Sequence, residues 1–347
     1  MLPEPGELGP ALHAAGVEVL VQPVAVLRRQ LLTASGLASI VRDTARNGAR
    51  LRSLIAEREI ALVHSNTSVV LGGAAGAALA RVPHVWHVRE IYSRFGRAWP
   101  GYRMLLGTAS ALPCVSGAAA AQFESAVRSR SRTRARVLHD GLAVDPHRAP
   151  RSQARTALAL PSDAPVVAML GRISDWKGQD ILVRALAEAP LASIGAIGVI
   201  AGDVWPGAEE RRDAVIDLAR SAGVADRVRL VGFRDDVENV YGAADVVAVP
   251  STAPDPLPNS ALEAAAAGCA VVASAHGGLP EIIRDRETGR LARPGDPSDL
   301  ASAAAELIGD PALRERLGAG AATDVRERFA PQRLLDAIQS LYDELLR

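Results

Sequence analysis

The segment "APVVAMLGRISDWKGQDILVRALAEA", residues 164–189, decides the fold. It begins with a largely apolar run over 164–172 and ends in a helical pattern, with a short polar loop between them. A run without polar alternation suits a strand buried on both faces, and such strands occur in parallel sheets covered by helices. The segment therefore predicts one strand–loop–helix unit of a doubly wound α/β domain.

The same alternation of strand and helix recurs on both sides of this segment. The further runs that predict strands are 17–23, 60–66, 84–88, 111–116 and 134–141 in the first half, and 196–203, 226–233, 244–251 and 269–275 in the second. A polar stretch at 145–155 separates the two series. We therefore predict two Rossmann-like domains, over residues 1–155 and 156–328.

The composition is that of an ordinary globular chain, with 347 residues of which 48% are hydrophobic and 22% charged. Acidic and basic residues number 39 each, so net charge gives no indication of nucleic-acid or membrane binding. Cys114 and Cys269 lie in separate apolar runs, which predicts buried thiols in a reducing compartment rather than a disulfide or zinc site. No apolar run is long enough to span a bilayer, and we expect a cytoplasmic protein.

Residues that directly follow predicted strands are the candidate ligand contacts, because open α/β sheets bind ligands beyond the carboxyl ends of their strands. Arg172 ends the strand predicted at 164–172 and Lys177 follows it, and both are suited to bind a diphosphate together with the next helix N-terminus. Two solvated surface cations are the alternative interpretation. The spacing of a Walker loop is absent.

The stretch "PDPLPNSALEAAAAG", residues 254–268, predicts a helix. Asn259 or Ser260 is expected to cap it, with Glu263 in its first turn and Gly268 at its end. Glu263 either partners the helix N-terminus or accepts hydrogen bonds from ribose hydroxyls.

Two glycines, Gly277 and Gly278, lie between the strand at 269–275 and a following helix. They either let backbone N–H groups approach a ligand or only form a tight turn. His84 and His87 would point to opposite faces of one strand, which argues against a shared metal ion. His87, at the strand end, is the better candidate for a ligand contact, and a structural histidine is the alternative.

The run "RSRSRTRAR", residues 128–136, carries five arginines. Its alternation is typical of a solvated loop and an edge strand. A contact with an anionic membrane or an acceptor is the second interpretation.

The order of the motifs closely resembles the retaining family-4 glycosyltransferases of the GT-B fold. The motifs that carry the resemblance are "GRIS..KGQDILVRAL", "GVIAGD", "VRLVGFRDDVENVYGAADVVAVPS", "DPLPNSALEAAAAGCAVVASAHGGLPEII" and "TGRLARPGD", with "VHSN" and "HVWHVREI" in the first half. The resemblance implies two Rossmann-like domains that face each other across a cleft. Residues 1–155 would form the acceptor-side domain, 156–328 the donor domain, and 329–347 a helix that returns to the first domain.

The resemblance also implies an activity: transfer of a sugar from a UDP- or GDP-sugar to a glycan, lipid or small-molecule acceptor, with the anomeric configuration retained. Asp255 and Glu263 match the acidic pair of the family. Glu263 would bind the ribose hydroxyls and Asp255 would face the donor sugar. Arg172 and Lys177 would bind the diphosphate and stabilise its growing negative charge.

The remaining expected contacts complete the donor site. His87 would lie beside the donor sugar, and the backbone N–H groups of Asn259 and Ser260 would reach the sugar or the phosphates. Further donor-binding residues implied by the resemblance are Gly202, Gly277 and Gly278. The nucleotide-sugar is a co-substrate, and we expect neither a metal ion nor another cofactor.

Three departures from the family pattern bear on these expectations. Asp255 stands where glutamate is usual, and Pro258 replaces a glycine and so lacks an N–H donor. The first strand and its glycine-bearing loop are missing before "LPEPGEL", and we expect a truncated or misassigned start.

Two other functions stay open: a non-catalytic nucleotide-sugar-binding protein, and another GT-B enzyme such as a nucleotide-sugar epimerase. We expect a monomer that binds no nucleic acid. Contact with the inner face of the membrane is left open.

Overall fold

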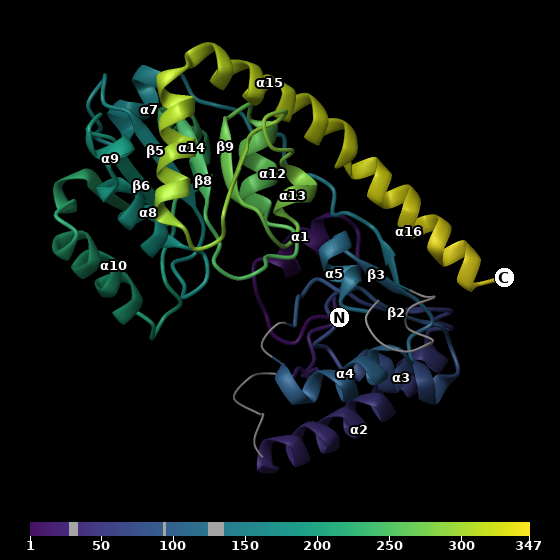
Figure 1. Cartoon of the computed structure of the whole chain (residues 1–347). Coiled ribbons are helices and arrows are strands. Elements are labelled where there is room, and N and C mark those ends of the chain that lie inside the picture. Colours follow the sequence, from purple (N-terminus) through teal and green to yellow (C-terminus); the bar gives the residue numbers. More distant parts are fainter. Residues whose placement is uncertain (28–33, 93–94, 124–134) are drawn as a thin grey trace. The chain divides into compact units, whose positions relative to one another are not determined.

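The computed structural model describes residues 1–27, 34–92, 95–123 and 135–347 (Figure 1). The chain divides into two compact units, which we call unit 1 (residues 1–138 and 336–347) and unit 2 (residues 139–335). Residues 128–134 of the arginine-rich run lie outside the described residues. Within the described ranges, no helix combines the length and the apolar character that a membrane span needs.

Unit 2 is built on one parallel sheet with the strand order β10-β9-β8-β5-β6-β7, of which Figure 1 labels β9, β8, β5 and β6. Its strands are β5 (Val166–Leu170), β6 (Ile197–Ala201), β7 (Val228–Gly232), β8 (Val246–Val249), β9 (Val271–Ser274) and β10 (Arg290–Ala292). The chain order reverses between β5 and β8, which lie side by side. The carboxyl ends of these two strands therefore form the topological switch point, where open sheets bind ligands.

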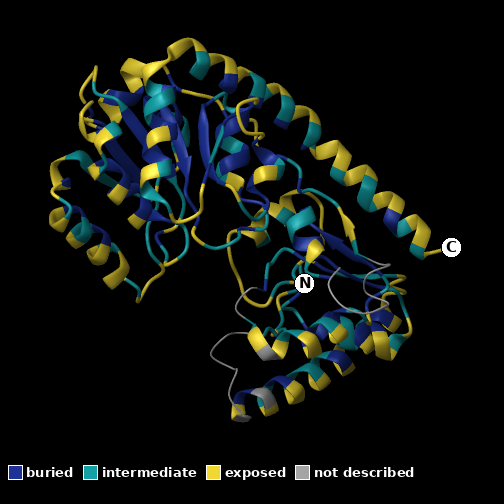
Figure 2. Cartoon of the chain, in the orientation of Figure 1, coloured by how far each residue is buried: buried dark blue, intermediate teal, exposed yellow. Residues whose placement is uncertain are grey.

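The central strands of unit 2 are buried along their whole length, as Figure 2 shows. The helices of the unit are α7 (Arg151–Ala157), α8 (Gln179–Ala187), α9 (Ala189–Ala192), α10 (Glu210–Ser221), α11 (Val237–Ala243), α12 (Asn259–Ala266), α13 (Leu279–Ile282), α14 (Pro297–Gly309) and α15 (Pro311–Arg328). The continuous apolar runs of the second half thus form the buried parallel strands that the sequence predicts. The short β10 was not predicted, because three residues are too few to show a pattern.

Unit 1 contains shorter strands, namely β1 (Val63–Ser65), β2 (His84–Trp86), β3 (Leu112–Cys114) and β4 (Ala135–Val137). β1 pairs with β2 and β3 with β4, both in parallel, and single bridges join β2 to β3. The helices are α1 (Leu8–Ala14), α2 (Ala34–Glu57), α3 (Gly72–Ala80), α4 (Trp99–Leu106) and α5 (Gly117–Ala121). Helices α2 and α3 pack closely because Gly76 has no side chain: a Cβ there would lie only 2.5 Å from the Cβ of Leu51.

The strand predicted over residues 17–23 is wrong. Val21 forms only a single parallel bridge with Leu2, in which Leu2 N–H donates to Leu20 and Gln22 N–H donates to Leu2. A strand needs a continuous ladder of backbone hydrogen bonds, and here one partner residue is present. The apolar alternation of the segment therefore does not decide its structure.

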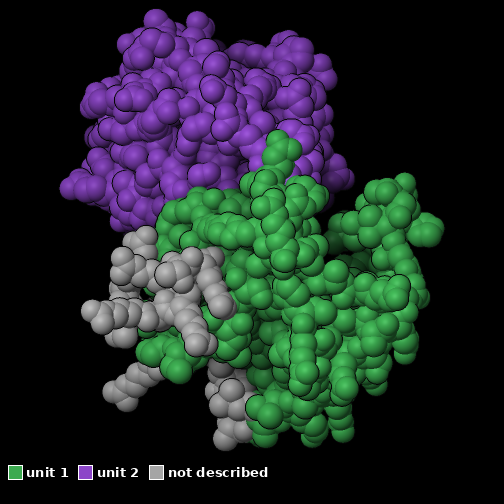
Figure 3. Space-filling model, turned by 90° about the vertical axis from the view of Figure 1, so that its right-hand side faces the viewer, with its two compact units in different colours: residues 1–138, 336–347 green, residues 139–335 purple. Residues whose placement is uncertain are grey.

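The boundary between the units falls at residues 138/139, upstream of the predicted boundary at 155 (Figure 3). The polar stretch at 145–155 packs within unit 2, where Ala149 N–H donates to Glu238 and helix α7 contacts α11. The last helix, α16 (Pro331–Leu345), contributes its residues from Asp336 onward to unit 1. There its Leu341 packs against Val85 of β2.

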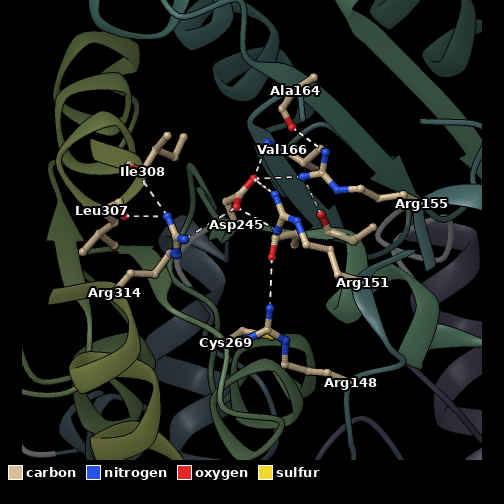
Figure 4. Close-up of polar contacts among 12 residues, drawn as sticks. Arg148, Arg151, Arg155, Ala164, Val166, Asp245, Cys269, Leu307, Ile308 and Arg314 are labelled. Atoms are coloured by element: carbon tan, nitrogen blue, oxygen red, sulfur yellow. Dashed lines mark hydrogen bonds and ion pairs between the residues drawn. The ribbon is translucent and has the colours of Figure 1, made fainter. Parts of the chain in front are cut away.

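A buried carboxylate, Asp245, connects three elements at the amino end of the unit 2 sheet (Figure 4). Its side chain is only 6% exposed and accepts the N–H of Val166, at the start of β5, at 2.8 Å. Arg151 and Arg155 of α7 bind it at 2.9 and 3.1 Å. Arg314 of α15 lies 3.9 Å away and donates to two carbonyls at the end of α14.

Arg155 is the most buried member of this group, with a side chain only 3% exposed. It also donates to the carbonyls of Pro161 and Ala164 at 2.7 Å. Burial lowers the pKa of Arg155, the charge of Arg151 acts in the same direction, and Asp245 opposes both. The Asp245 carboxylate is therefore the group that makes a buried guanidinium tolerable.

We predict that Asp245→Asn lowers the free energy of unfolding by about 3–5 kcal/mol, because it leaves Arg155 buried without its counter-ion. Urea denaturation measures the change. The control is Asp217→Asn, since Asp217 pairs with Arg220 on the surface with both side chains about 70% exposed. The control should cost less than about 1 kcal/mol. Equal losses in the two variants would contradict this account of the buried network.

Candidate functional site

Two of the residues predicted for the site, Lys177 and Asp255, are in direct contact. Lys177 Nζ lies 2.7 Å from Asp255 Oδ2, and the two side chains are 22% and 7% exposed. Lys177 lies on the loop after β5, and Asp255 lies on the loop after β8. The ion pair therefore sits at the switch point of the sheet, as the predicted topology requires.

Backbone contacts hold these two loops together. Thr252 N–H and Oγ1 both donate to the carbonyl of Trp176, the first at 2.8 Å. Gly178 has a φ of +86°, and a Cβ there would clash with the carbonyl oxygen of Pro250. Only glycine permits this approach, so the loop that carries Lys177 is pressed against the end of β8.

The Gly-Gly turn after β9 supports Asp255 from the other side. Gly278 N–H donates to the Asp255 carbonyl at 2.8 Å, and a Cβ on Gly278 would clash with the carbonyl of Pro256. Gly277 has a φ of +61°, and a Cβ there would clash with the backbone of Asp255. Packing alone accounts for both glycines, and their contact with a nucleotide stays a prediction.

The predicted cap of helix α12 is wrong. The helix begins at Asn259 with Pro258 as its N-cap and without a side-chain cap, so Glu263 lies in the second turn. The extended backbone of Pro258 lets its carbonyl accept the first helical bonds, from Ala261 and Leu262. Asn259 and Ser260 are therefore first-turn residues, whose N–H groups have no acceptor within a helix.

The end of the helix is as predicted: Gly268 follows it with a φ of +75°. The Glu263 side chain is half-buried and accepts a hydrogen bond from the Tyr241 hydroxyl at 3.2 Å. Burial raises the pKa of Glu263, and the bond from Tyr241 opposes this only in part. A carboxylate offers about four acceptor positions, so Glu263 retains capacity for further donors such as a pair of hydroxyls.

Arg172 also follows β5, and its guanidinium stacks on an indole. Its Cζ lies 3.7 Å from the centroid of the Trp205 ring, on the loop after β6. Gly202, on the same loop, has a φ of +141°, and a Cβ there would clash with the carbonyl of Gly171. Its N–H donates to Gly232 at 2.7 Å. Gly202 thus joins the ends of three strands, and its contact with a donor stays a prediction.

His87 belongs to unit 1, where it follows β2 and is only 3% exposed. Burial lowers its pKa to about 3, and the charges of His64 and Arg89 act in the same direction. His87 is therefore a neutral ring that can exchange hydrogen bonds with a neutral ligand. His84 instead contacts the Ser65 hydroxyl at 3.0 Å, which makes it a structural residue.

Sequence reasoning missed two side chains of the site, Tyr241 and Trp205. Tyr241 lies in an apolar helix where an aromatic residue indicates core, and it is indeed fully buried. Trp205 gave a clearer signal, because a lone tryptophan in the polar stretch "GDVWPGAEE" follows a strand directly. Across the described residues, no group of three or more His, Cys, Asp or Glu side chains is placed to hold a metal ion.

Comparison with known proteins agrees with this geometry. The family model "Glycosyl transferases group 1" matches residues 150–324, just over half of the chain. A D-inositol 3-phosphate glycosyltransferase of Saccharomonospora viridis is 38% identical over 203 residues, which are 56% of this chain and 46% of that protein. The chain spans about half the length of the curated relatives it matches.

Solved structures extend the similarity to nearly the whole chain. The crystal structure of Anabaena HepE in complex with UDP has a TM-score of 0.82 at 25% identity, and covers 99% of this chain and 91% of that one. A sucrose-phosphate synthase from Thermosynechococcus elongatus has a TM-score of 0.77 at 25% identity, with 98% and 92% covered.

The matched segment includes the sheet of unit 2 and all four charged residues of the predicted donor site, Arg172, Lys177, Asp255 and Glu263. The structural similarity covers unit 1 as well and identifies the fold as GT-B. This chain therefore belongs to the family of glycosyl transferases group 1.

Proposed function

We propose that the protein transfers a sugar from a nucleotide-sugar donor, bound by unit 2, to a hydroxyl of an acceptor. The observation that carries the proposal is the Lys177–Asp255 ion pair at the switch point of the sheet, in a chain that belongs to this family. Two cations and two carboxylates at the ends of β5, β8 and α12 match the charge and the hydroxyl groups of such a donor.

The donor that we propose is a UDP-sugar. The support is the Anabaena HepE structure, which contains UDP and is 25% identical to this chain. In the donor complex Arg172 and Lys177 bind the diphosphate, Glu263 binds the ribose hydroxyls and Asp255 binds a hydroxyl of the sugar. The first-turn N–H groups of Asn259 and Ser260 have no acceptor within the helix and can donate to an anionic group or a hydroxyl of the donor.

The proposed reaction retains the anomeric configuration. The acceptor hydroxyl attacks the anomeric carbon from the side that the nucleotide leaves, and an oxygen of the leaving diphosphate takes the acceptor proton. Arg172 and Lys177 stabilise the negative charge that grows on the diphosphate. Asp255 is engaged by Lys177 and buried, which suits an orienting residue better than a nucleophile. Contact of the neutral His87 ring with a donor sugar stays a prediction.

For the acceptor we propose a small molecule with free hydroxyl groups. The support is the name of the curated relatives, which are D-inositol 3-phosphate glycosyltransferases at 34–39% identity. A screen of small-molecule, lipid and glycan acceptors tests this proposal. Transfer to a lipid or a glycan, with or without membrane contact, would be its other outcome.

Calorimetric titration of the full chain with UDP and GDP tests the donor site. We expect UDP to bind and Glu263→Ala to weaken it by roughly 10- to 150-fold, which corresponds to the loss of charge-assisted hydrogen bonds. The matched control is Glu210→Ala, because Glu210 lies on α10 with its side chain 71% exposed. Tight binding of GDP instead of UDP would reassign the base. Failure of both nucleotides to bind would refute the donor site, and binding without turnover of any UDP-sugar would refute the activity.

We predict that the affinity for UDP-glucose falls at acidic pH because of Glu263. Burial raises the pKa of this carboxyl in the free protein, while ribose hydroxyls favour the ionised form. Affinity is therefore highest above that pKa and falls as the pH drops through it, by at most about tenfold per pH unit. Titrations between about pH 7.5 and about pH 4.5 measure the fall, since both phosphates of UDP-glucose are diesters that stay ionised over this range. The fall should vanish in Glu263→Gln and persist in Glu210→Gln.

Lys177 and Asp255 should affect the binding of UDP and of UDP-glucose differently. We predict that Lys177→Met weakens UDP and UDP-glucose by the same factor, about tenfold or more, because both ligands carry the diphosphate. Asp255→Asn should weaken UDP-glucose alone, because only that ligand carries a sugar. Isothermal titration with both ligands measures the ratio. An Asp255→Asn variant that loses affinity for UDP as strongly as for UDP-glucose would show that Asp255 acts only by holding Lys177.

A further inference from the structure

We propose that Trp205 is a positioning residue, which holds the Arg172 guanidinium where the donor diphosphate binds. The inference rests on the proposed function, because it assumes that Arg172 binds the diphosphate. Trp205 is 61% exposed, which is unusual for so large an apolar side chain, and the Arg172 guanidinium lies 3.7 Å from its ring centroid. A cation at this distance from an indole face is attracted by the ring quadrupole.

The backbones that carry the two side chains are fixed relative to each other. Arg172 follows β5 and Trp205 follows β6, and these strands are neighbours in the sheet. On either side of Arg172, Gly171 N–H donates to Ala201 at 2.9 Å and Ile173 N–H donates to Asp203 at 3.0 Å. The strand ladder thus continues past the end of both strands and brings the loops into register.

The Arg172 carbonyl is also fixed, because it accepts a hydrogen bond from the Gln179 side chain at 2.9 Å. Gln179 is the first residue of α8 and is buried. With the main chain held in this way, the long side chain is the only part of Arg172 left to order. Stacking on Trp205 restricts that side chain before a ligand arrives, which lowers the entropy cost of binding.

The two cations of the site both lie over an indole ring, and they differ in whether a carboxylate pairs with them. Lys177 lies 4.4 Å from the centroid of the Trp176 ring and is also paired with the Asp255 carboxylate. By contrast, no carboxylate in the described part of the chain forms an ion pair with Arg172. A carboxylate partner would compete with a phosphate for the guanidinium N–H groups. An aromatic face orients the guanidinium plane and leaves its N–H donors, which lie in that plane, and its full charge available to a phosphate.

Direct stacking of the nucleobase on Trp205 is the alternative role for an exposed indole in this place. The two roles differ in which part of the nucleotide they affect. A positioning role acts through the diphosphate, whereas base stacking would act equally on a nucleoside without phosphates. Comparison of UDP with uridine therefore separates them.

The experiment measures the affinities of UDP and uridine by calorimetry for the full chain and for Trp205→Leu, Trp205→Phe, Arg172→Ala and the double variant Arg172→Ala/Trp205→Leu. We expect Trp205→Leu to weaken UDP about two- to fivefold and to leave uridine unchanged, which is the range of an exposed cation–π contact. Trp205→Phe should restore most of the affinity. In the Arg172→Ala background, Trp205→Leu should have no further effect.

A control remote from the site is Ile194→Ala. Ile194 is 40% exposed between α9 and the amino end of β6, at the opposite edge of the sheet, and its loss should change neither affinity. Equal weakening of UDP and uridine by Trp205→Leu would overturn the proposal in favour of base stacking. An unchanged UDP affinity in Trp205→Leu, beside a loss in Arg172→Ala, would overturn it while leaving the proposed function intact. If the unaltered chain bound neither UDP nor GDP, the proposed donor site and this inference would both fail.

Discussion

The structure of unit 2 depends on one buried charge. Asp245 lies at the amino end of β8 and receives hydrogen bonds from the first residue of β5 and from two arginines of α7. The same two strands carry Lys177 and Asp255 beyond their opposite ends. The buried ion pair thus holds together the amino ends of the two strands whose carboxyl ends lead into the loops of Lys177 and Asp255.

The proposed donor site holds its two positive charges differently. Lys177 lies beside an indole and is compensated by a buried carboxylate, whereas Arg172 lies on an indole and has no carboxylate partner among the described residues. In the proposed donor complex, the diphosphate would compete with Asp255 for Lys177 and would bind Arg172 without such a competitor. Both arrangements exist before a ligand is bound, and such preorganisation is what lets fixed charges stabilise a transition state without further reorganisation.

Much of unit 2 could be predicted from the sequence, because its strands are apolar at nearly every position and therefore show their burial directly. The site positions of Asp255 and Glu263 came from the resemblance to a family. The start of α12 was missed because Pro258, a residue without a capping side chain, takes the N-cap place from Asn259. The strand predicted over residues 17–23 was wrong because an apolar pattern does not reveal whether a partner strand is present. Trp205 was missed because a stacked cation depends on two loops meeting in space.

The glycines around the site limit how it can change. At Gly178, Gly277 and Gly278, any side chain would collide with a backbone carbonyl rather than with a movable group. A substitution there would displace the main chain, so these positions cannot change ligand preference in small steps. In the proposed donor site, a change of donor selectivity would therefore have to arise at the ends of side chains such as Asp255 and Trp205, which can be exchanged without displacing the main chain. A directed-evolution library that spares the glycines and varies those tips would sample specificity while leaving the scaffold intact.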